Sequence, residues 1–415
     1  MYTKSVLNNG LRVVTEELPA FRSAAVGLWL TVGSRDETAA EGGLTHFLEH
    51  MAFKGTGRRN TYEIAREIDQ LGGLGNAFTT KEHTCYHARV LAEHLPRAVD
   101  LLADLVLHPL YLEEEMERER QVILEEIAAQ DDTPEDLVQV LFARDFWQGQ
   151  PLGRPILGHT AAVGSFRQDH LLAYRQSTYR PEHLVVAAAG RLRHQEVLDL
   201  VEPLFENFSN GSPRRTRPGA APSPGVHLHP RDLEQLHLVM GAPGLPAADD
   251  RRFAATVLNL ILGGNMSSRL FQVVREQLGL AYSIYSHLSF FSDVGLLEIA
   301  AGVNPRNLPV LVRAVNLELA RFKEEPLPAE ELDAAKEYLK GSLALNTEDC
   351  EQRMLRLARN EIYFGRHLSV EEVLEGLNRV TAAEVQDLAR EFFQPHRWAL
   401  TLLGPLDGPA PEPEF

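Results

Sequence analysis

The sequence predicts an α+β fold of two homologous repeats, each a mostly antiparallel sheet with helices packed on one face. Three observations lead to this prediction: the length of the chain, an internal repeat, and the alternation of β-rich segments with helical ones. The chain has 415 residues, more than one compact core usually holds and enough for two domains. Apolar residues make up 44% and charged residues 24%, the balance of an ordinary globular protein.

The internal repeat shows as three pairs of similar segments. In the first pair, residues 89–106 and 301–319, each segment passes from a strand end through a Leu-Pro pair into an amphipathic helix. The other two pairs are 111–127 with 327–343 and 184–192 with 398–406. The offsets lie between 213 and 216 residues, which indicates a two-fold duplication.

Within each repeat, β-rich segments alternate with helical ones. Residues 24–34 and 84–91 read as strands in the first half, and residues 236–244 and 296–303 read as strands in the second. Long helical patterns follow each group of strands. The short links between strands favour an antiparallel sheet with its helices on one face.

Residues 209–225 separate the two halves. This stretch, "SNGSPRRTRPGAAPSPG", is rich in Pro, Gly and Ser and follows neither the helical nor the strand period, so we predict a linker. The domains predicted on either side are an N-terminal domain, 1–208, and a homologous C-terminal domain, 226–415.

Charge, cysteines and hydropathy exclude several classes of protein. The formal net charge of −17 argues against a nucleic-acid-binding protein, which would carry basic patches. Cys85 and Cys350 lie far apart in sequence, so we expect neither a disulfide framework nor a cysteine-ligated zinc site, and we infer a reducing compartment. The N-terminal segment does not resemble a signal peptide, and no window reaches the ~18 apolar residues of a membrane span. We therefore predict a cytoplasmic protein without a membrane span.

The most informative stretch is "GGLTHFLEHMAFKGTGRRN", residues 42–60. On a helix, at about 100° per residue, four of its apolar residues form an ordinary core stripe: Leu44, Phe47, Leu48 and Met51. The roughly opposite face gathers His46, Glu49, His50 and Phe53. A solvated face would more often carry Lys, Arg, Ser or Gln, so this face favours a role for two imidazoles and a carboxylate.

The histidine pair on this face has the spacing of a metal site. His46 and His50 stand at i and i+4, so one cation can reach both rings, and zinc takes such a pair with one further N or O ligand and a water. Glu49 lies beside them, where it could take a proton from that water. The pattern H-x-x-E-H is a metallopeptidase signature. The alternative is a structural helix with two packed histidines and a surface glutamate.

A third ligand is available on the helix predicted from about Glu113. With Glu119 taken as the reference, Glu126 falls within about 80° of it, as do the apolar residues Met116, Val122, Ile123 and Ile127. A carboxylate within an apolar stripe is costly unless it is paired or binds a cation. Glu126 as ligand and Glu119 as its support would explain both. The alternative is a wetter helix edge, or pairing with Arg118 or Arg120.

The second half has no equivalent of this cluster. At the repeat offset, Glu126 falls on Ser342 and Glu125 on Gly341, and the second half has no H-x-x-E-H. The metal chemistry is therefore predicted for the N-terminal domain alone, and the C-terminal domain is predicted to have no metal site.

Together these residues resemble the pitrilysin-type (M16) zinc peptidases. The resemblance rests on "THFLEHMAFKGT", on Glu126 at 76 positions after His50, and on "GGLGNAFTTKEHT", "PLGRPILG" and "SSRLFQVVREQLGLAYSIYS". It runs through nearly the whole chain. It is strongest to the branch that contains the mitochondrial processing peptidase β subunit and its bacterial relatives.

The resemblance implies a role for each residue of the site. His46, His50 and Glu126 would bind one zinc ion, Glu49 would be the general base, and Glu119 matches the family's additional glutamate behind the site. Asn76 and Ala77 match an edge strand that holds the substrate peptide in extended form, which an unpaired strand edge can do. From the residues alone, the favoured interpretation of Asn76 is a turn residue after the glycine-rich stretch 72–75.

In the second half the resemblance points to an Arg/Tyr pair, Arg275 and Tyr282, that helps to bind substrate and stabilise the oxyanion. A guanidinium and a phenol are suitable donors to a developing negative oxygen. From the residues alone, Arg275 reads as a residue on a helix surface and Tyr282 as the start of a strand.

The function implied is that of a zinc-dependent endopeptidase, in which Glu49 activates a zinc-held water against a peptide bond. Relatives of this type enclose peptides or unfolded segments in a clam-shell chamber built by two subunits, so the partner is expected to be a second copy or a related subunit. The Arg/Tyr pair would then come from the partner chain. The alternatives are a non-catalytic subunit of the same fold, with an assembly or substrate-binding role, and a zinc hydrolase of non-peptide substrates.

Overall fold

The computed structural model describes residues 1–208 and 216–405, which form two compact units. Unit 1 consists of Met1–Ala128, Arg154–Pro218 and Ala344–His367. Unit 2 consists of Ala129–Gly153, Gly219–Leu343 and the described residues from Leu368 onward. Each unit contains one β-sheet with its own hydrophobic core.

The sheet of unit 1 has six strands in the described residues, and all but one of its strand pairs are antiparallel. The parallel pair is β2 with β6. In spatial order the strands are β1 (Tyr2–Val6), β2 (Arg12–Glu17), β6 (Leu184–Gly190), β3 (Ser23–Leu30), β5 (Thr84–Leu91) and β4 (Leu74–Thr79). Strand β4 therefore lies at an edge of the sheet.

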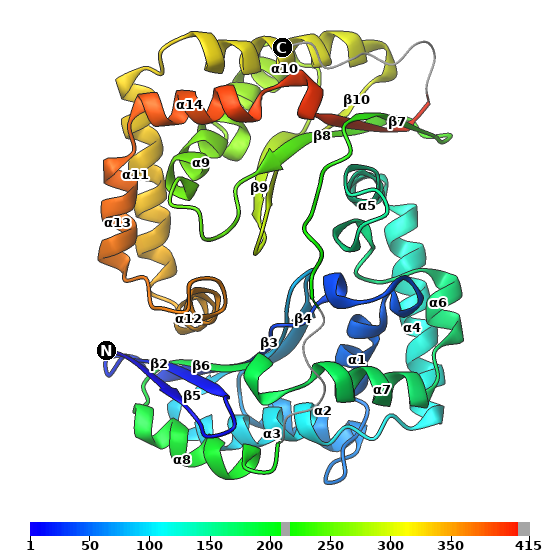
Figure 1. The fold of residues 1–415 in the computed structure, drawn as a ribbon, viewed down its shortest axis with the longest axis vertical. Coiled ribbons are helices and arrows are strands. Elements are labelled where there is room, and N and C mark those ends of the chain that lie inside the picture. The colour runs from blue at the N-terminus through cyan, green and yellow to red at the C-terminus, as the bar shows by residue number, and fades with distance from the viewer. Residues whose placement is uncertain (209–215, 406–415) are drawn as a thin grey trace. The chain divides into compact units, whose positions relative to one another are not determined.

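Helices cover both faces of this sheet (Figure 1). The helices of unit 1 are α1 (Leu44–Ala52), α2 (Thr61–Gln70), α3 (Leu95–Leu107), α4 (Glu113–Asp132, whose last residues belong to unit 2), α6 (Thr160–Ser165), α7 (Gln168–Thr178), α8 (His194–Phe205) and α12 (Cys350–Phe364). Helix α3 packs on β3 and β5, and α8 packs on β2. Helix α12 packs on β2, β3 and β6 from the opposite side, above the sheet in the view of Figure 1.

The sheet of unit 2 repeats the topology of unit 1. In spatial order its strands are β7 (Gly225–Pro230), β11 (Ala399–Gly404), β8 (Leu236–Gly244), β10 (Gly295–Val303) and β9 (Ile284–Phe290). This order matches β2-β6-β3-β5-β4 of unit 1, with the parallel pair in the same place. The predicted duplication is confirmed at the level of strand order and strand direction.

The helices of unit 2 also lie on both faces of its sheet. They are α5 (Pro134–Phe146), α9 (Arg252–Asn259), α10 (Leu308–Glu324), α11 (Ala329–Asn346, whose last residues belong to unit 1), α13 (Val370–Arg379) and α14 (Ala382–Phe392). Helix α5 packs on β8 and β11 through Leu141, Phe142 and Phe146. The main core of the unit lies on the other face, under α9, α10 and α14.

The predicted fold class is confirmed: each repeat is a mostly antiparallel sheet with a layer of helices. The structure adds one helix on the second face of each sheet, and that helix comes from the other half of the chain. Helix α12 packs Met354 and Leu357 against Trp29 and Val185 of the first sheet, and α5 does the same for the second sheet. The compact units therefore differ from two contiguous halves of the chain, because one apolar helix from each half packs on the sheet formed by the other half.

The predicted linker is described in part. Residues 209–215 lie outside the described residues, and residues 216–224 contain no helix or strand before β7 begins at Gly225. Arg217 is held against unit 1, where its guanidinium donates to Asp36 at 2.7 and 2.8 Å. The domain boundaries 1–208 and 226–415 remain a prediction about the repeats in the sequence.

One half-buried carboxyl in unit 2 makes a testable contribution to stability. Glu298 on β10 stands opposite His287 of β9 and makes no hydrogen bond or ion pair within the described chain. Burial raises the pKa of Glu298 to about 7. Because the folded state then binds the proton more tightly than the unfolded chain, the stability that protonated Glu298 contributes is lost as the pH rises from about 4 to about 7.

We therefore expect Glu298→Gln to stabilise unit 2 at pH 8 and to leave its stability nearly unchanged at pH 4. One pKa unit corresponds to about 1.4 kcal/mol, and because the side chain is only partly shielded from water we expect a gain of about 1 kcal/mol at pH 8. Urea unfolding at the two pH values measures it, with the exposed Glu330→Gln as the matched control. An equal change in the free energy of unfolding at both pH values would show that Glu298 titrates as it does in the unfolded chain.

Candidate metal centre

Helix α1 carries the two histidines on one face and packs its opposite, apolar face into the core. Its apolar stripe is buried as the sequence predicted, with Leu44, Phe47, Leu48 and Met51 each at most 1% exposed. The helix starts after Gly43, whose φ of 92° lies in the left-handed region that glycine adopts readily. Its other face carries His46 and His50, whose ring centroids are 4.4 Å apart.

Helix α4 supplies the two glutamates. Glu119 is 4% exposed and lies among the buried residues of this helix, whereas the side chain of Glu126 is 41% exposed at the edge of the apolar stripe. The pairing of these glutamates with arginine, which the sequence left open, does not occur in the described structure. Arg118 pairs with Glu114 and Glu115, and Arg120 pairs with Glu117.

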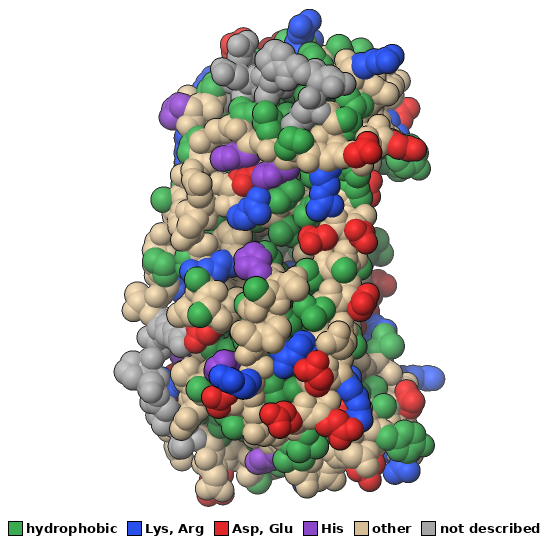
Figure 2. Space-filling view, turned by 90° about the vertical axis from the view of Figure 1, so that its right-hand side faces the viewer, with side chains coloured by type: hydrophobic (Ala, Val, Ile, Leu, Met, Phe, Trp, Pro, Cys, Tyr) green, Lys and Arg blue, Asp and Glu red, His purple; other side chains and the backbone are tan. Residues whose placement is uncertain are grey.

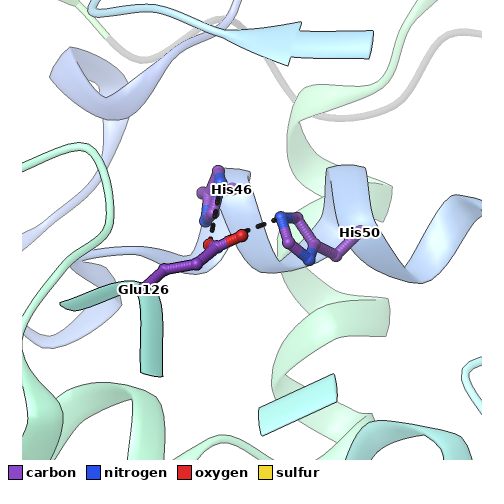
Figure 3. Close-up of side chains that lie close together, drawn as sticks. All are labelled: His46, His50 and Glu126. Carbon is purple, nitrogen blue, oxygen red and sulfur yellow. Dashed lines mark ion pairs between the residues drawn. The ribbon is translucent and has the colours of Figure 1, made fainter. Parts of the chain in front are cut away.

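The two helices bring His46, His50 and Glu126 together, and Figure 3 shows the two rings and the carboxylate pointing toward one another. One oxygen of Glu126, Oε2, lies 3.9 Å from His46 Nε2 and 3.7 Å from His50 Nε2. One potential ligand atom from each residue lies within 4.8 Å of the others. No other group of this kind occurs in residues 1–208 and 216–405.

The residues present fit a zinc ion. Glu126 Oε2 is buried and has no hydrogen-bond partner, and its distances to the two Nε2 atoms are too long for hydrogen bonds. They are close to the ligand–ligand separation of about 3.4 Å expected in a tetrahedral site with bonds of about 2.1 Å. Burial and the neighbouring His50 lower the pKa of His46 to about 3, so its imidazole is neutral and available as a ligand.

A second carboxylate orients His50 from behind. Glu119 Oε1 lies 2.7 Å from His50 Nδ1, which leaves Nε2 facing Glu126. The Lys54 ammonium lies 2.6 Å from the other oxygen of Glu119. Burial opposes ionisation of Glu119, but the hydrogen bonds from His50 and Lys54 outweigh it and lower the pKa of the carboxyl. A carboxylate that accepts the second N–H of a metal-ligating histidine fixes its tautomer and makes it a better ligand.

Glu49 is held beside the three ligand residues without being one of them. It is 8% exposed, which excludes the alternative of a surface glutamate. The hydroxyl of Thr79 on β4 donates to Glu49 Oε2 at 2.5 Å. Burial raises the pKa of Glu49, partly offset by the Thr79 hydrogen bond and by the charge of His50. A carboxylate with a raised pKa is a stronger base than a solvated one.

The predicted peptide-binding residues lie on the edge strand of unit 1. Asn76 and Ala77 are in β4, where they pair with His87 and Tyr86 of β5, and in the described residues no strand pairs with the other side of β4. The alternative of a turn residue for Asn76 is therefore wrong. Strand β4 runs from these residues directly to Thr79, the partner of Glu49.

Arg275 and Tyr282 lie in unit 2 and contact each other. The guanidinium carbon of Arg275 is 5.0 Å from the ring centroid of Tyr282 and 4.7 Å from that of Phe271. Arg275 belongs to a π-helical segment, Phe271–Gln277, and Tyr282 precedes β9 with 85% of its surface exposed. The Arg275 side chain is half-buried, and its Nε also lies 3.6 Å from Glu276 Oε1.

Two residues of the site were not predicted from the sequence. Lys54 pairs with Glu119 from a position two residues past the end of α1, so helical periodicity did not indicate it. Thr79 follows Ala77 by two residues, so both point to the same face of β4. Its contact with Glu49 depends on how β4 lies beside α1, which local sequence does not specify.

The support from Glu119 predicts a measurable effect on metal affinity. Glu119→Gln keeps the size of the side chain but removes the charge that polarises His50, so we expect zinc affinity to fall by about 10–100-fold. Competition with a chromophoric chelator measures it. Glu125→Gln, an exposed neighbour of Glu126, is the matched control and should bind zinc as tightly as the wild type; equal affinities for all three proteins would contradict this role of Glu119.

On the face shown in Figure 2, acidic and basic side chains are interspersed. No helix in the described residues is long and apolar enough to cross a membrane. The two cysteines are both buried and free.

Comparison with known proteins gives matches along nearly the whole chain. Residues 12–160 match the family model described as Insulinase (Peptidase family M16), and residues 165–339 match the one described as Peptidase M16 inactive domain. An uncharacterized zinc protease of Streptomyces coelicolor is 42% identical over 97% of this chain and 89% of its own length. One of Bacillus subtilis, YmxG, is 39% identical over 98% of both chains.

Solved structures share the fold. A protease from Helicobacter pylori has a TM-score of 0.93 at 21% sequence identity, covering 98% of this chain and 99% of that one. A Pseudomonas fluorescens structure titled as a peptidase M16 inactive domain has a TM-score of 0.92 at 20% identity, covering 99% of this chain and all of its own.

Proposed function

The chain belongs to peptidase family M16, and from this premise we propose that it is a zinc-dependent endopeptidase acting on peptides or unfolded polypeptide segments. The observation that supports this most is the convergence of His46, His50 and Glu126, with Glu49 held beside them. The relatives bear the name zinc protease, which agrees with this donor set.

In this proposal His46, His50 and Glu126 hold one zinc ion per chain, in unit 1. Two imidazole nitrogens and one carboxylate oxygen are the three protein ligands of many catalytic zinc sites, which leave a further position open. When bound, zinc acidifies water and polarises a carbonyl group. Glu119 keeps His50 in the tautomer that offers Nε2.

Glu49 acts as the general base and then as the general acid. Its carboxylate takes a proton from the attacking water and delivers it to the leaving amine as the peptide bond breaks. The hydrogen bond from Thr79 holds one oxygen of Glu49, so the other oxygen is the one available for proton transfer. Burial keeps the pKa of Glu49 above that of a solvated carboxyl, which favours both transfers.

The substrate is proposed to be an extended peptide paired with β4. An edge strand binds a peptide through main-chain hydrogen bonds and tolerates many side chains, which suits a processing or degrading enzyme. Asn76 and Ala77 provide the main-chain groups, and Thr79 at the end of the same strand contacts Glu49. A peptide paired along β4 would therefore extend toward Glu49, the proposed base.

Arg275 and Tyr282 are proposed to bind substrate and to donate to the oxygen that becomes negative in the transition state. Both side chains belong to unit 2, where Tyr282 is exposed and Arg275 is half-buried beside it. We propose that the protein works as a homodimer, or as a heterodimer with a related subunit, and that the pair acts on the zinc site of the partner chain.

The test measures zinc per chain and cleavage of a quenched peptide library by the purified protein. We expect about one zinc per chain, and cleavage that is lost on treatment with a chelator and restored by zinc. Zinc binding without cleavage of any peptide would contradict the proposal and favour a non-catalytic subunit with an assembly or substrate-binding role. Mass measurement in solution distinguishes a homodimer from a chain that needs a partner.

A further inference from the structure

Helix α1, which carries His46 and His50, has no N-capping side chain at its start. Residue 43, immediately before α1, is glycine and has no side chain to accept the first amide hydrogens of the helix. It cannot readily be another residue, since its φ is 92° and a Cβ there would lie 2.6 Å from the carbonyl oxygen of Leu157. The backbone of residues 157 and 158 packs directly against this turn.

A carboxylate from outside the helix satisfies these amides. Glu37 Oε2 accepts from the Gly43 amide at 2.9 Å, and Glu37 Oε1 accepts from the Thr45 amide at 2.7 Å. Glu37 is 3% exposed, so water does not compete for these hydrogen bonds. His46 is the next residue after Thr45. The position of this first ligand therefore depends on the hydrogen bonds that Glu37 accepts.

The segment that carries Glu37 is attached to the turn after the edge strand. The amides of Ser34 and Arg35 donate to the carbonyl oxygens of Thr80 and Lys81, at 3.1 and 2.7 Å. Thr80 directly follows Thr79, the residue that holds Glu49. Glu37 thus connects α1, through its own segment, to the end of β4.

A third segment closes this network. The Lys81 ammonium donates to the carbonyl oxygen of Arg154 at 2.5 Å, and the guanidinium of Arg154 donates to the carbonyl oxygen of Glu37. Arg154 belongs to "PLGRPILG", a stretch that contributes no residue to the metal site. Within this stretch, Arg154 contacts Glu37 and Lys81. Leu157 and Gly158 of the same stretch pack against Gly43 at the start of α1.

We infer that Glu37 is a positioning residue for the metal site, which sets the place of α1 relative to β4 and hence of His46 and Glu49 relative to Thr79. This inference rests on the proposed function, since it concerns how the same site is held. Glu37 touches neither substrate nor metal in this account. It acts through the Gly43 and Thr45 amides and through the segment bonded to Thr80 and Lys81.

The test compares Glu37→Gln with a cap variant of unit 2. In Glu37→Gln the amide oxygen still accepts one backbone N–H, but the NH₂ group faces the other N–H as a second donor, so one bond is lost. The matched control is Thr381→Ala, which removes the hydroxyl that accepts from the Glu384 amide at 3.2 Å at the start of α14. Both variants should lower the melting temperature.

Zinc affinity of the folded variants is measured by chelator competition well below their melting temperatures. We expect the zinc dissociation constant to rise at least about 10-fold in Glu37→Gln, as for the loss of other residues that orient ligands, and to stay unchanged in Thr381→Ala. With zinc saturating, kcat should fall more than KM changes, because β4 keeps its free edge. If Glu37→Gln melts earlier but binds zinc like the wild type, Glu37 is merely structural and the inference is wrong.

Amide hydrogen exchange of the zinc-free protein gives a second readout. We expect faster exchange in peptides covering residues 43–52 and 79–83 of Glu37→Gln, and no change there in Thr381→Ala. If Glu37→Gln does not fold, Glu37→Asp, which keeps the carboxyl group but shortens its reach, serves for both measurements. A wild-type protein that binds no zinc would contradict the proposed function itself, whereas unchanged exchange in the variant would contradict only the role of Glu37.

Discussion

Glu49→Gln is expected to abolish peptide cleavage while the protein keeps its zinc. The amide has the shape of the carboxylate and can still accept the hydrogen bond from Thr79, so the fold around α1 should persist. It cannot take a proton from water at neutral pH. General base catalysis is worth about 10²–10⁴-fold, and since Glu49 is also the proposed acid we expect a loss toward the upper end of that range.

Cleavage of a quenched peptide and zinc content are measured on the same preparation. The zinc content should equal that of the wild type, because Glu49 is not among the three residues whose ligand atoms converge. Glu125→Gln on α4 serves as a control for the loss of one negative charge and should remain fully active. Full activity in Glu49→Gln would remove Glu49 as the base.

Loss of one metal ligand should have the second large effect. Glu126→Gln and His46→Ala each remove one of three ligands, so we expect zinc affinity to fall by about 100-fold or more, beyond the 10–100-fold typical of supporting residues. Cleavage should fall in parallel. Glu126→Gln should not destabilise the zinc-free protein, because Glu126 Oε2 is buried without a hydrogen-bond partner.

Thermal unfolding with added zinc distinguishes these variants from the wild type. A ligand that binds only the folded state stabilises it by about 4 kcal/mol at 1,000 times its dissociation constant. The wild-type melting temperature should therefore rise with zinc, while those of Glu126→Gln and His46→Ala should change little at the same concentrations. An equal rise in all three proteins would place the zinc site elsewhere.

Periodicity was sufficient to predict the parts of the site that lie on single helices. The stripe through Leu44 and Met51 fixed the face of α1 that carries the histidines, and the angle between Glu119 and Glu126 placed both on one side of α4. The burial of the two glutamates differs, because Glu126 lies at the edge of that stripe where α4 meets solvent. The internal repeat and the alternation of strand-like and helical segments were likewise sufficient to predict the fold class.

The contacts that the sequence did not predict all depend on tertiary packing. Thr79 and Glu37 reach α1 from segments whose direction is set by strand pairing and by backbone hydrogen bonds between loops. The placement of α12 on the first sheet has the same cause. Its apolar residues Met354 and Leu357 show that one face is buried, but a helical pattern does not tell which of two similar sheets receives it.

We expect one divalent ion to be held by two imidazoles of α1 and one carboxylate of α4. Anomalous X-ray scattering at the zinc edge, from crystals of the zinc-loaded protein, tests it most directly. We predict a single peak in unit 1 at about 2.0–2.2 Å from His46 Nε2, His50 Nε2 and a carboxylate oxygen of Glu126. A zinc peak with Glu126 turned away from it, or a peak at other residues, would contradict the account.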